Sequence, residues 1–483
     1  MAFNSWQFLV FLVVVFAGYF LLPKKARHYF LLLASYFFYA YWNWMLIFLI
    51  IGTTAVSYAS GFFIDKYRDN KALKITLLIT TLVVSLGALI FFKYFNFLAD
   101  SIVSLINAFG GKAEFDALDI ILPVGISFYT FQTLSYVIDI YRGTIQAEKN
   151  PVYYALYVSF FPQLVAGPIE RPENLLPQFK EKAPINVDNI KVGLQFMLQG
   201  FVKKIVIADL LATFVNSVYN DLSNTNGLLI SVGTICFALQ IYGDFSGYSD
   251  IAFGTAKLFN INLMKNFDRP YKSGSIKEFW RRWHISLSNW FKDYLYIPLG
   301  GSRVCWARWA LNVFIVFFLS GLWHGAALTF IIFGVMHAIY QIVGRATLPL
   351  RDKLWRKMNI DPDYAIGVKV ARTIVTFILV CLAWIPFRAN SFNDMLMIYQ
   401  NLFTNWNVDF GHFKDVLDLS WDRIILFVIA ICMYFVCDRI ATLPIKNVWV
   451  KDAIYVLLIW SIAVTFIYLK SSNMDSSFIY FQF

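Results

Sequence analysis

The sequence predicts an all-α polytopic membrane protein with roughly 11–13 membrane segments, folded as a single domain over residues 1–483. Hydrophobic residues make up 59% of the chain and charged residues only 15%, whereas an ordinary soluble domain is about 25% charged. A soluble protein of this composition would expose very large apolar patches. Intrinsic disorder is also excluded, because it requires low hydrophobicity and high charge.

Twelve apolar runs mark the expected membrane segments, and two of them, 228–259 and 310–345, are long enough to contain a break or a second crossing. A helix of about 20 apolar residues crosses the hydrocarbon core of a bilayer. The runs comprise residues 6–22, 29–40, 44–63, 73–98, 120–140, 152–167, 192–216, 228–259, 310–345, 366–387, 422–443 and 453–470.

The net charge of +11, from 41 Lys and Arg residues against 30 Asp and Glu, indicates membrane topology and not nucleic-acid binding. Basic residues gather in cytoplasmic loops, and no basic soluble module with interleaved aromatic residues stands apart from the spans. The basic clusters at 24–27, 66–74 and 351–357 are therefore expected on the cytoplasmic side. Counting spans from these clusters places the N-terminus and the tail Ser471–Phe483 outside the cytoplasm.

The segment FFPQLVAGPIERPENLLPQF, Phe160–Phe179, interrupts the pattern of a plain helical bundle. It contains four prolines together with Glu170, Arg171 and Glu173. Proline removes a helix donor and restricts the residue before it, so the segment is not a simple helix. Two interpretations remain open, which are a surface loop and a re-entrant loop that walls a substrate passage.

Asp244 and Asp250 stand among aromatic and glycine residues in QIYGDFSGYSDIAFG, Gln240–Gly254. Ionisable groups in a membrane segment are costly and usually face a cavity or a partner. We therefore expect the two aspartates to face a substrate passage. The alternative is structural ion pairing with a lysine such as Lys203 or Lys204.

The run KEFWRRWHISLSNWFKDYLYIPLGGSR, Lys277–Arg303, mixes basic residues with tryptophans and contains His284 in its middle. This mixture is typical of an amphipathic helix at the membrane interface. Most of its charges are expected to face lipid headgroups or the cytosol.

His324 is the histidine whose surroundings indicate a catalytic role. It lies in SGLWHGAALTFIIFGVMHAIY, Ser320–Tyr340, among apolar residues. Burial disfavours the charged imidazolium, so we expect a neutral ring able to accept a proton, and a histidine within a bilayer is a functional-site hypothesis by default. The alternative is a histidine with a purely structural role. His284 comes from another segment and could meet His324.

His337 follows His324 by 13 residues. On one straight helix this spacing corresponds to about 20 Å of rise and a rotation of roughly 220°. The two histidines therefore cannot share a metal ion or a proton unless the helix breaks, for instance near Gly334. No zinc motif, phosphate-binding loop or nucleophile elbow is visible, so we expect no metal ion and no bound cofactor.

Several of these segments, in this order, resemble the membrane-bound O-acyltransferase (MBOAT) family. The similarity spans nearly the whole chain and is closest to the bacterial branch that acetylates envelope polysaccharides such as alginate and peptidoglycan. It is carried by LPVGISFYTFQTLSYVIDIYRG (Leu122–Gly143), GPIERP, QIYGDFSGYSD, FWRRWHISLSNWFKDYLYIPLGGSR and GLWHGA.

The resemblance implies a helical cup around a central tunnel in a bacterial inner membrane, with His324 catalytic and His284 a second important residue. We expect His337, Asp244, Asp250 and Trp323 along this tunnel. The implied donor is an acetyl thioester such as acetyl-CoA, whose phosphates Lys277, Arg281 and Arg282 could hold, although positive-inside topology explains these charges equally well. The implied partners are membrane lipids and an extracytoplasmic SGNH-hydrolase-like acetyltransferase, which passes the acetyl group to the polysaccharide.

The last residues, FIYFQF at Phe478–Phe483, resemble the C-terminal signature of the small peptide subunit in the related D-alanyl-teichoic-acid machinery. That resemblance implies that Tyr480 holds the acyl group. The alternative is an aromatic tail anchored at the membrane interface. For the whole protein, the alternative function is a transporter of polysaccharide or a lipid intermediate without acyltransferase activity.

Overall fold

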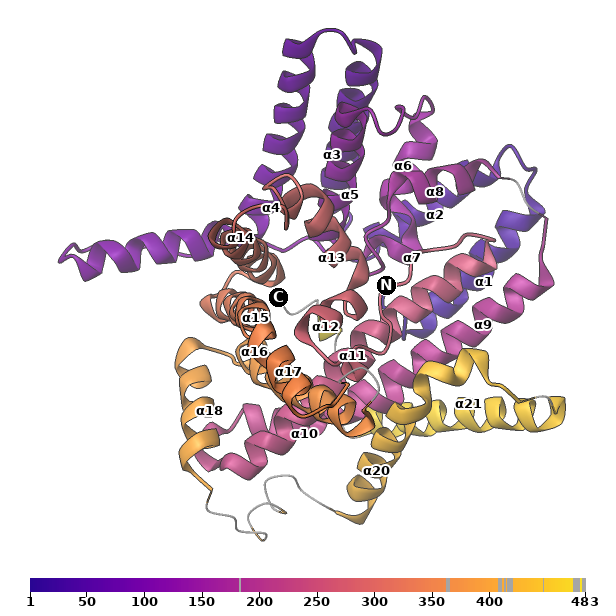
Figure 1. Ribbon diagram of the computed structural model, residues 1–483. Helices are drawn as coiled ribbons and strands as arrows, with labels where there is room; N and C mark the ends of the chain where they lie inside the picture. Colours follow the sequence, from indigo (N-terminus) through magenta and orange to yellow (C-terminus); the bar gives the residue numbers. More distant parts are fainter. Residues whose placement is uncertain are drawn as a thin grey trace. The chain divides into compact units, whose positions relative to one another are not determined.

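The computed structural model describes residues 1–181, 184–361, 365–406, 411, 414, 420–445, 447–471, 478 and 479. Every regular element within these ranges is a helix (Figure 1). Eight segments of the described chain are long and apolar enough to cross a membrane. The prediction of an all-α polytopic membrane protein is therefore confirmed. The larger predicted number of segments, which counted shorter and re-entrant pieces, and the central tunnel remain predictions.

The eight segments are distributed over the whole chain, and α1 (Trp6–Leu21) is apolar but shorter. Seven of them are the helices α3 (Leu46–Lys66), α4 (Lys71–Ala108), α11 (Gly227–Leu258), α14 (Trp306–His324), α15 (Leu328–Ala346), α17 (Ile366–Arg388) and α21 (Val448–Ser471). The eighth, Arg423–Thr442, consists of most of α20 (Trp421–Val436) together with the 3₁₀ turn η5 (Cys437–Thr442).

The chain packs as two compact units. The first unit comprises Met1–Met197 and Ile251–Met264, and the second comprises Leu198–Asp250 and Lys265–Phe483. Two helices, α9 (Val187–Phe201) and α11, run through both units. Folding as a single domain remains a prediction.

The first unit contains a group of neighbouring long helices. In it α3, α4 and α5 (Ile126–Arg142) lie side by side (Figure 1). A second group is formed by α2 (Arg27–Ala40), α6 (Pro151–Ser159), α7 (Phe161–Leu164) and α8 (Pro172–Lys180), in which α6 contacts both α2 and α8. Nearly all of α5 is buried, including the polar side chains of Gln132 and Asp139.

The proline-rich segment is part of the core of the first unit. Residues 160–172 are all buried, so the interpretation as a surface loop is wrong. The prolines allow this packing because Pro162 and Pro172 occupy the first turns of α7 and α8, where a missing N–H leaves no intrahelical bond unmade.

Glu170 is a fully buried carboxyl group in this segment. Its side chain accepts hydrogen bonds from the backbone N–H of Met264 and, at 2.7 Å, from Asn174 Nδ2. The Tyr157 hydroxyl donates to the Glu170 carbonyl oxygen at 3.0 Å. Burial outweighs these bonds and raises the pKa of Glu170 from 4.5 to about 7.

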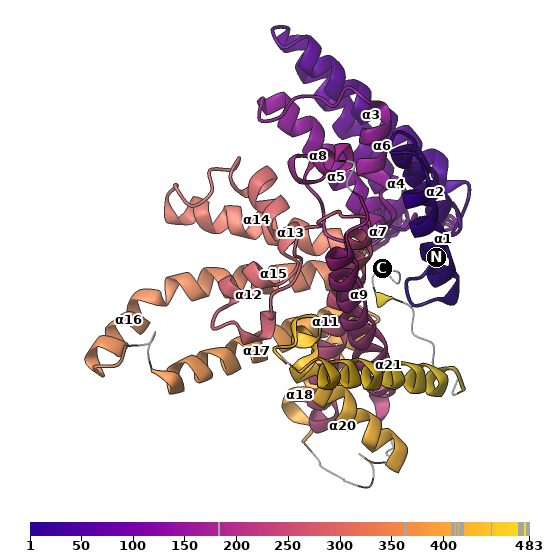
Figure 2. The ribbon, with the colours of Figure 1, turned by 90° about the vertical axis from the view of Figure 1, so that its right-hand side faces the viewer.

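The second unit is built around α14, α15 and α17, which run alongside one another (Figures 1 and 2). Gly321 and Gly334 let α14 and α15 approach closely, because a Cβ on Gly321 would lie 3.1 Å from the Gly334 Cα. The remaining elements are η1 (Val202–Asp209), α10 (Leu210–Tyr219), η2 (Leu222–Asn224), η3 (Pro270–Lys272), α12 (Ile276–Arg282), α13 (Ile285–Phe291), η4 (Lys292–Tyr296), α16 (Leu348–Lys357) and α18 (Phe392–Thr404).

Of the two long apolar runs, one breaks and the other does not. The run 310–345 divides into α14 and α15 at residues 325–327, so it contains a break, although not at Gly334, the example considered from the sequence. Gly334 lies inside α15, where it serves the helix contact. The run 228–259 remains one continuous helix, α11, despite its glycines. A Cβ at Gly247 would lie 2.8 Å from the Gly200 carbonyl oxygen, so this glycine lets α11 pack closely on the preceding helix.

The run 277–303 is not the single interfacial helix that its composition suggested. It forms two short helices, α12 and α13, followed by the π-helical turn η4. Trp280, Trp283 and Trp290 are all buried. The tryptophans are buried within the protein, and the interruption between α12 and α13 falls at residues 283–284.

Glu170 predicts a pH dependence of stability. Because its pKa is higher in the folded chain, the folded state binds more protons than the unfolded state between about pH 4.5 and 7. Its stabilising contribution is therefore complete below this window and is lost as the pH rises through it. We expect the melting temperature of the detergent-solubilised protein to fall over this window, and to fall less in Glu170→Gln.

The control for this measurement is Glu173→Gln, since Glu173 is exposed in the same segment. It should keep the pH dependence of the wild type. An equal fall of the melting temperature in the wild type and in Glu170→Gln would contradict the assignment.

Candidate active site

His284, Trp323 and His324 lie together in the core of the second unit. The ring centroids of His284 and Trp323 are 5.6 Å apart, and those of Trp323 and His324 are 5.0 Å apart. All three side chains are buried. One tryptophan ring therefore contacts two histidines that come from different segments of the chain.

His324 is the last residue of α14, and aromatic side chains of two further helices surround it. Its ring centroid lies 5.6 Å from that of Phe333 on α15 and 5.3 Å from that of Phe387 on α17, both edge-on. An imidazole in its neutral form can accept a proton from a hydroxyl group.

His284 connects α12 to α13 in a left-handed backbone conformation with φ of 43°. This conformation is uncommon for a residue other than glycine and is often associated with functional sites. The Asn266 carbonyl oxygen accepts a hydrogen bond from the adjacent Ile285 N–H at 2.9 Å. Burial lowers the pKa of His284 from 6.5 to about 3, so the ring is neutral at physiological pH. Its ring centroid is 4.7 Å from that of Phe245.

His337 is fully buried and accepts a hydrogen bond at Nδ1 from Trp280 Nε1–H at 3.2 Å. This bond assigns the proton of the neutral ring to Nε2. Phe333 contacts both His337, at 4.8 Å between ring centroids, and His324. The break between α14 and α15 thus brings the two histidines against one ring, although one straight helix would separate them.

Lys203 is a buried cation in the second unit. Its Nζ lies 2.8 Å from Asp250 Oδ2 on α11 and 2.7 Å from Asp438 Oδ1 on η5. Gln199 Nε2 donates to Asp250 at 2.8 Å, and the Tyr242 hydroxyl donates to Asp438 at 2.7 Å. Asp438 was not singled out by sequence reasoning. The only available signal was a charged residue within the apolar run 422–443.

Lys204 is the second buried cation, and its Nζ lies 2.8 Å from both Asp209 Oδ1 and Asp244 Oδ1. Both lysines belong to η1, a π-helical segment, and such segments are rare and frequent at functional sites. Ion pairing, the structural alternative for Asp244 and Asp250, is therefore present. A role for the two aspartates along a substrate passage remains a prediction.

The C-terminal tail returns to the core of the second unit at Phe478 and Ile479, which are 5% and 4% exposed. The Ile479 backbone N–H donates to Asp244 Oδ2 at 2.7 Å. The Phe478 ring centroid lies 4.6 Å from that of Tyr248. Tyr480, the predicted acyl carrier, lies outside the described residues.

The basic residues expected to hold the acetyl donor differ in their exposure and in whether they form an ion pair. Lys277 and Arg281 are exposed on α12. Arg282 is paired with Glu278 on the same helix, with 2.7 Å between Nη2 and Oε1. No group of three or more His, Cys, Asp or Glu side chains that could hold a metal ion occurs among the residues that the structure describes.

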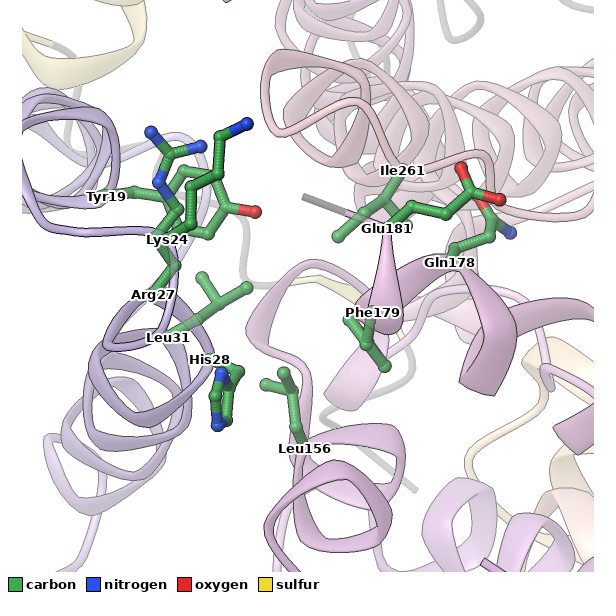
Figure 3. Close-up of a pocket in the computed structure, with 10 residues that line it drawn as sticks. All are labelled: Tyr19, Lys24, Arg27, His28, Leu31, Leu156, Gln178, Phe179, Glu181 and Ile261. Atoms are coloured by element: carbon green, nitrogen blue, oxygen red, sulfur yellow. The ribbon is translucent and has the colours of Figure 1, made fainter. Parts of the chain in front are cut away.

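The first unit contains a pocket with ten lining residues (Figure 3). Arg27, at its edge, donates to the carbonyl oxygens of Phe20 and Leu22, both at 3.3 Å, and thereby satisfies the end of α1. The pocket is lined by Tyr19, Lys24, Arg27, His28, Leu31, Leu156, Gln178, Phe179, Glu181 and Ile261.

Comparison with known proteins gives matches over nearly the whole chain. Residues 145–385 match the model of the membrane-bound O-acyltransferase family. The chain is 40% identical to the probable alginate O-acetylase AlgI of Pseudomonas aeruginosa, over 84% of this chain and 75% of the relative. It is 34% identical to the peptidoglycan O-acetyltransferase of Helicobacter pylori, over 100% and 97%. It is also 27% identical to the teichoic acid D-alanyltransferase of Bacillus subtilis, over 56% and 69%.

Lys203 gives a prediction for stability. Its replacement in Lys203→Met leaves Asp250 and Asp438 without their cation, and breaking a buried pair in this way costs about 3–5 kcal/mol. We expect the free energy of unfolding in mixed detergent micelles to fall by an amount of this order. The matched control is Lys277→Met, which removes an exposed lysine and should leave stability unchanged. Equal stability of the two variants would contradict the interpretation.

Proposed function

Because this chain belongs to the membrane-bound O-acyltransferase family, we propose that it moves an acetyl group from a cytosolic thioester, such as acetyl-CoA, to a cell-envelope polysaccharide. The chain is a multi-pass membrane O-acyltransferase, so the transporter alternative is not retained. The names of its relatives place alginate and peptidoglycan first among the acceptors to test. The proposed location is a bacterial inner membrane, with both termini on its outer side.

The His284–Trp323–His324 cluster is the observation that carries this proposal. A tyrosine hydroxyl has a pKa of about 10 and is a poor nucleophile until a base accepts its proton. His324, which is buried in contact with aromatic side chains, is the proposed base, and Tyr480 is the proposed nucleophile. The N–H of a neutral His284 or a backbone N–H is the proposed donor to the developing oxyanion.

The proposed step forms one ester and breaks one thioester. The Tyr480 oxygen attacks the thioester carbonyl carbon while its proton passes to His324. The carbon–sulfur bond then breaks, and the proton leaves with the thiol of the donor. An extracytoplasmic SGNH-hydrolase-like partner would take the acetyl group from Tyr480 through its own serine and deliver it to the polysaccharide.

The contacts of Ile479, which precedes Tyr480 in the sequence, support this relay. Ile479 bonds to Asp244, and the next residue along α11, Phe245, contacts His284. For the donor, we propose that the exposed Lys277 and Arg281 attract the phosphates of coenzyme A. Arg282 contributes less, because it is paired with Glu278.

Replacement of His324 tests the proposed base. In vesicles loaded with labelled acetyl donor, His324→Ala should lose acetyl transfer by a factor of about 10² or more, the size of a general-base contribution. His28→Ala, which removes a half-buried histidine of the first unit, should retain it. Polymer acetylation near the wild-type rate in folded, inserted His324→Ala would show that His324 is not the base.

Replacement of Tyr480 tests the acyl carrier separately. Intact-mass analysis after incubation with donor should reveal an acetyl adduct on the wild type that is absent from Tyr480→Phe, because the phenyl ring lacks the nucleophilic oxygen. Equal polymer acetylation by Tyr480→Phe would exclude the relay, even if His324 is essential.

A further inference from the structure

Asp244 divides its carboxylate between two partners that are far apart in the sequence. Oδ1 lies 2.8 Å from Lys204 Nζ, and Oδ2 accepts a 2.7 Å hydrogen bond from the Ile479 backbone N–H. Asp244 and Ile479 are only 3% and 4% exposed. A buried carboxylate needs partners for both oxygens. The C-terminal segment therefore completes the environment of an aspartate that Lys204 alone leaves half satisfied.

Aromatic side chains of the same helix face receive the neighbouring residue. Residues 244, 245 and 248 are spaced so that they lie on adjoining positions of α11. The Phe478 ring centroid is 4.6 Å from that of Tyr248 and 6.1 Å from that of Phe245. The Phe245 ring also contacts His284 at 4.7 Å. One stretch of α11 thus offers a carboxylate for a main-chain donor and two rings for an aromatic side chain, next to a candidate catalytic histidine.

We propose that Asp244, Phe245 and Tyr248 form a binding seat for the C-terminal segment of this chain, and that the seat positions this segment for acyl transfer beside His284. The inference deepens the proposed function and rests on it. Asp244 and Tyr248 are positioning residues in this scheme, since they act on the tail and not on the acetyl group.

The proposed seat binds the main chain at residue 479 and contacts the side chain at residue 478. Ile479 binds Asp244 through its backbone N–H, so another apolar residue with an N–H can make the same bond. Lys204 orients the carboxylate and is itself held by Asp209, 2.8 Å away on the same π-helix.

The test measures docking of the tail in the full-length protein by hydrogen–deuterium exchange of its C-terminal peptide, without donor. Loss of a hydrogen bond to a charged group should speed exchange by about tenfold or more. We expect this in Asp244→Ala, which removes the acceptor, and in Ile479→Pro, which removes the donor. Ile479→Val keeps the backbone N–H and should exchange as the wild type does. The double variant that combines Asp244→Ala with Ile479→Pro should exchange no faster than either single variant, because the two single variants and the double variant all lack the same hydrogen bond.

Acetyl transfer by the same variants tests the positioning role. It should fall by about tenfold or more in Asp244→Ala and Ile479→Pro, and it should stay near the wild-type rate in Glu173→Gln, which changes an exposed residue of the first unit. Ile479→Pro keeps the test decisive if Asp244→Ala does not fold, since it leaves the buried ion pairs intact. Unchanged exchange in Ile479→Pro overturns the seat. A released tail with undiminished transfer overturns its positioning role.

Failure of the proposed function has a different signature. If the wild type forms no acetyl adduct while its tail is protected from exchange and Ile479→Pro releases it, the seat exists but the Tyr480 relay does not. If the adduct forms and exchange is equal in all variants, the relay stands and the seat is overturned.

Discussion

Two neighbouring buried lysines determine how the second unit is assembled. A buried charge without a partner costs several kcal/mol, so each lysine fixes the position of whatever carries its carboxylates. Lys203 ties α11 to the 3₁₀ turn η5, and Lys204 ties α11 to the end of its own π-helix. Glycines on α11 permit the close approach that these short contacts require. Because Asp244 also accepts from Ile479, the C-terminal segment joins the same network.

The second unit also contains a cluster of aromatic side chains around its buried histidines, and this cluster is distinct from the ionic network. His284, His324 and His337 each contact several aromatic rings, including the shared Trp323 and Phe333. The second unit therefore keeps two kinds of buried group apart. Ion pairs lie along η1 and α11, and the three histidines lie among rings after α12, at the end of α14 and within α15.

The sequence supports different parts of this picture to different degrees. Helical spans and a buried His324 follow from hydrophobicity, because a helix of apolar residues has one stable environment. The pairing of Asp250 with Lys203 was one of two open interpretations, since charge complementarity does not reveal distance. Asp438 could not be assigned at all, because it reaches Lys203 across more than two hundred residues. The π-helix and the left-handed His284 depend on tertiary packing, which overrides local preference.

Recognition of the tail through a backbone N–H has a consequence for how this enzyme tolerates change. The side chain at residue 479 can change among apolar types without loss of the hydrogen bond between the backbone N–H and Asp244. Register cannot drift in the same way, because a slip of one residue would bring a different amide to Asp244 and remove Phe478 from its place against Tyr248. The contacts at Phe478 and Ile479 therefore fix which amide meets Asp244, while they leave the type of apolar side chain at residue 479 open.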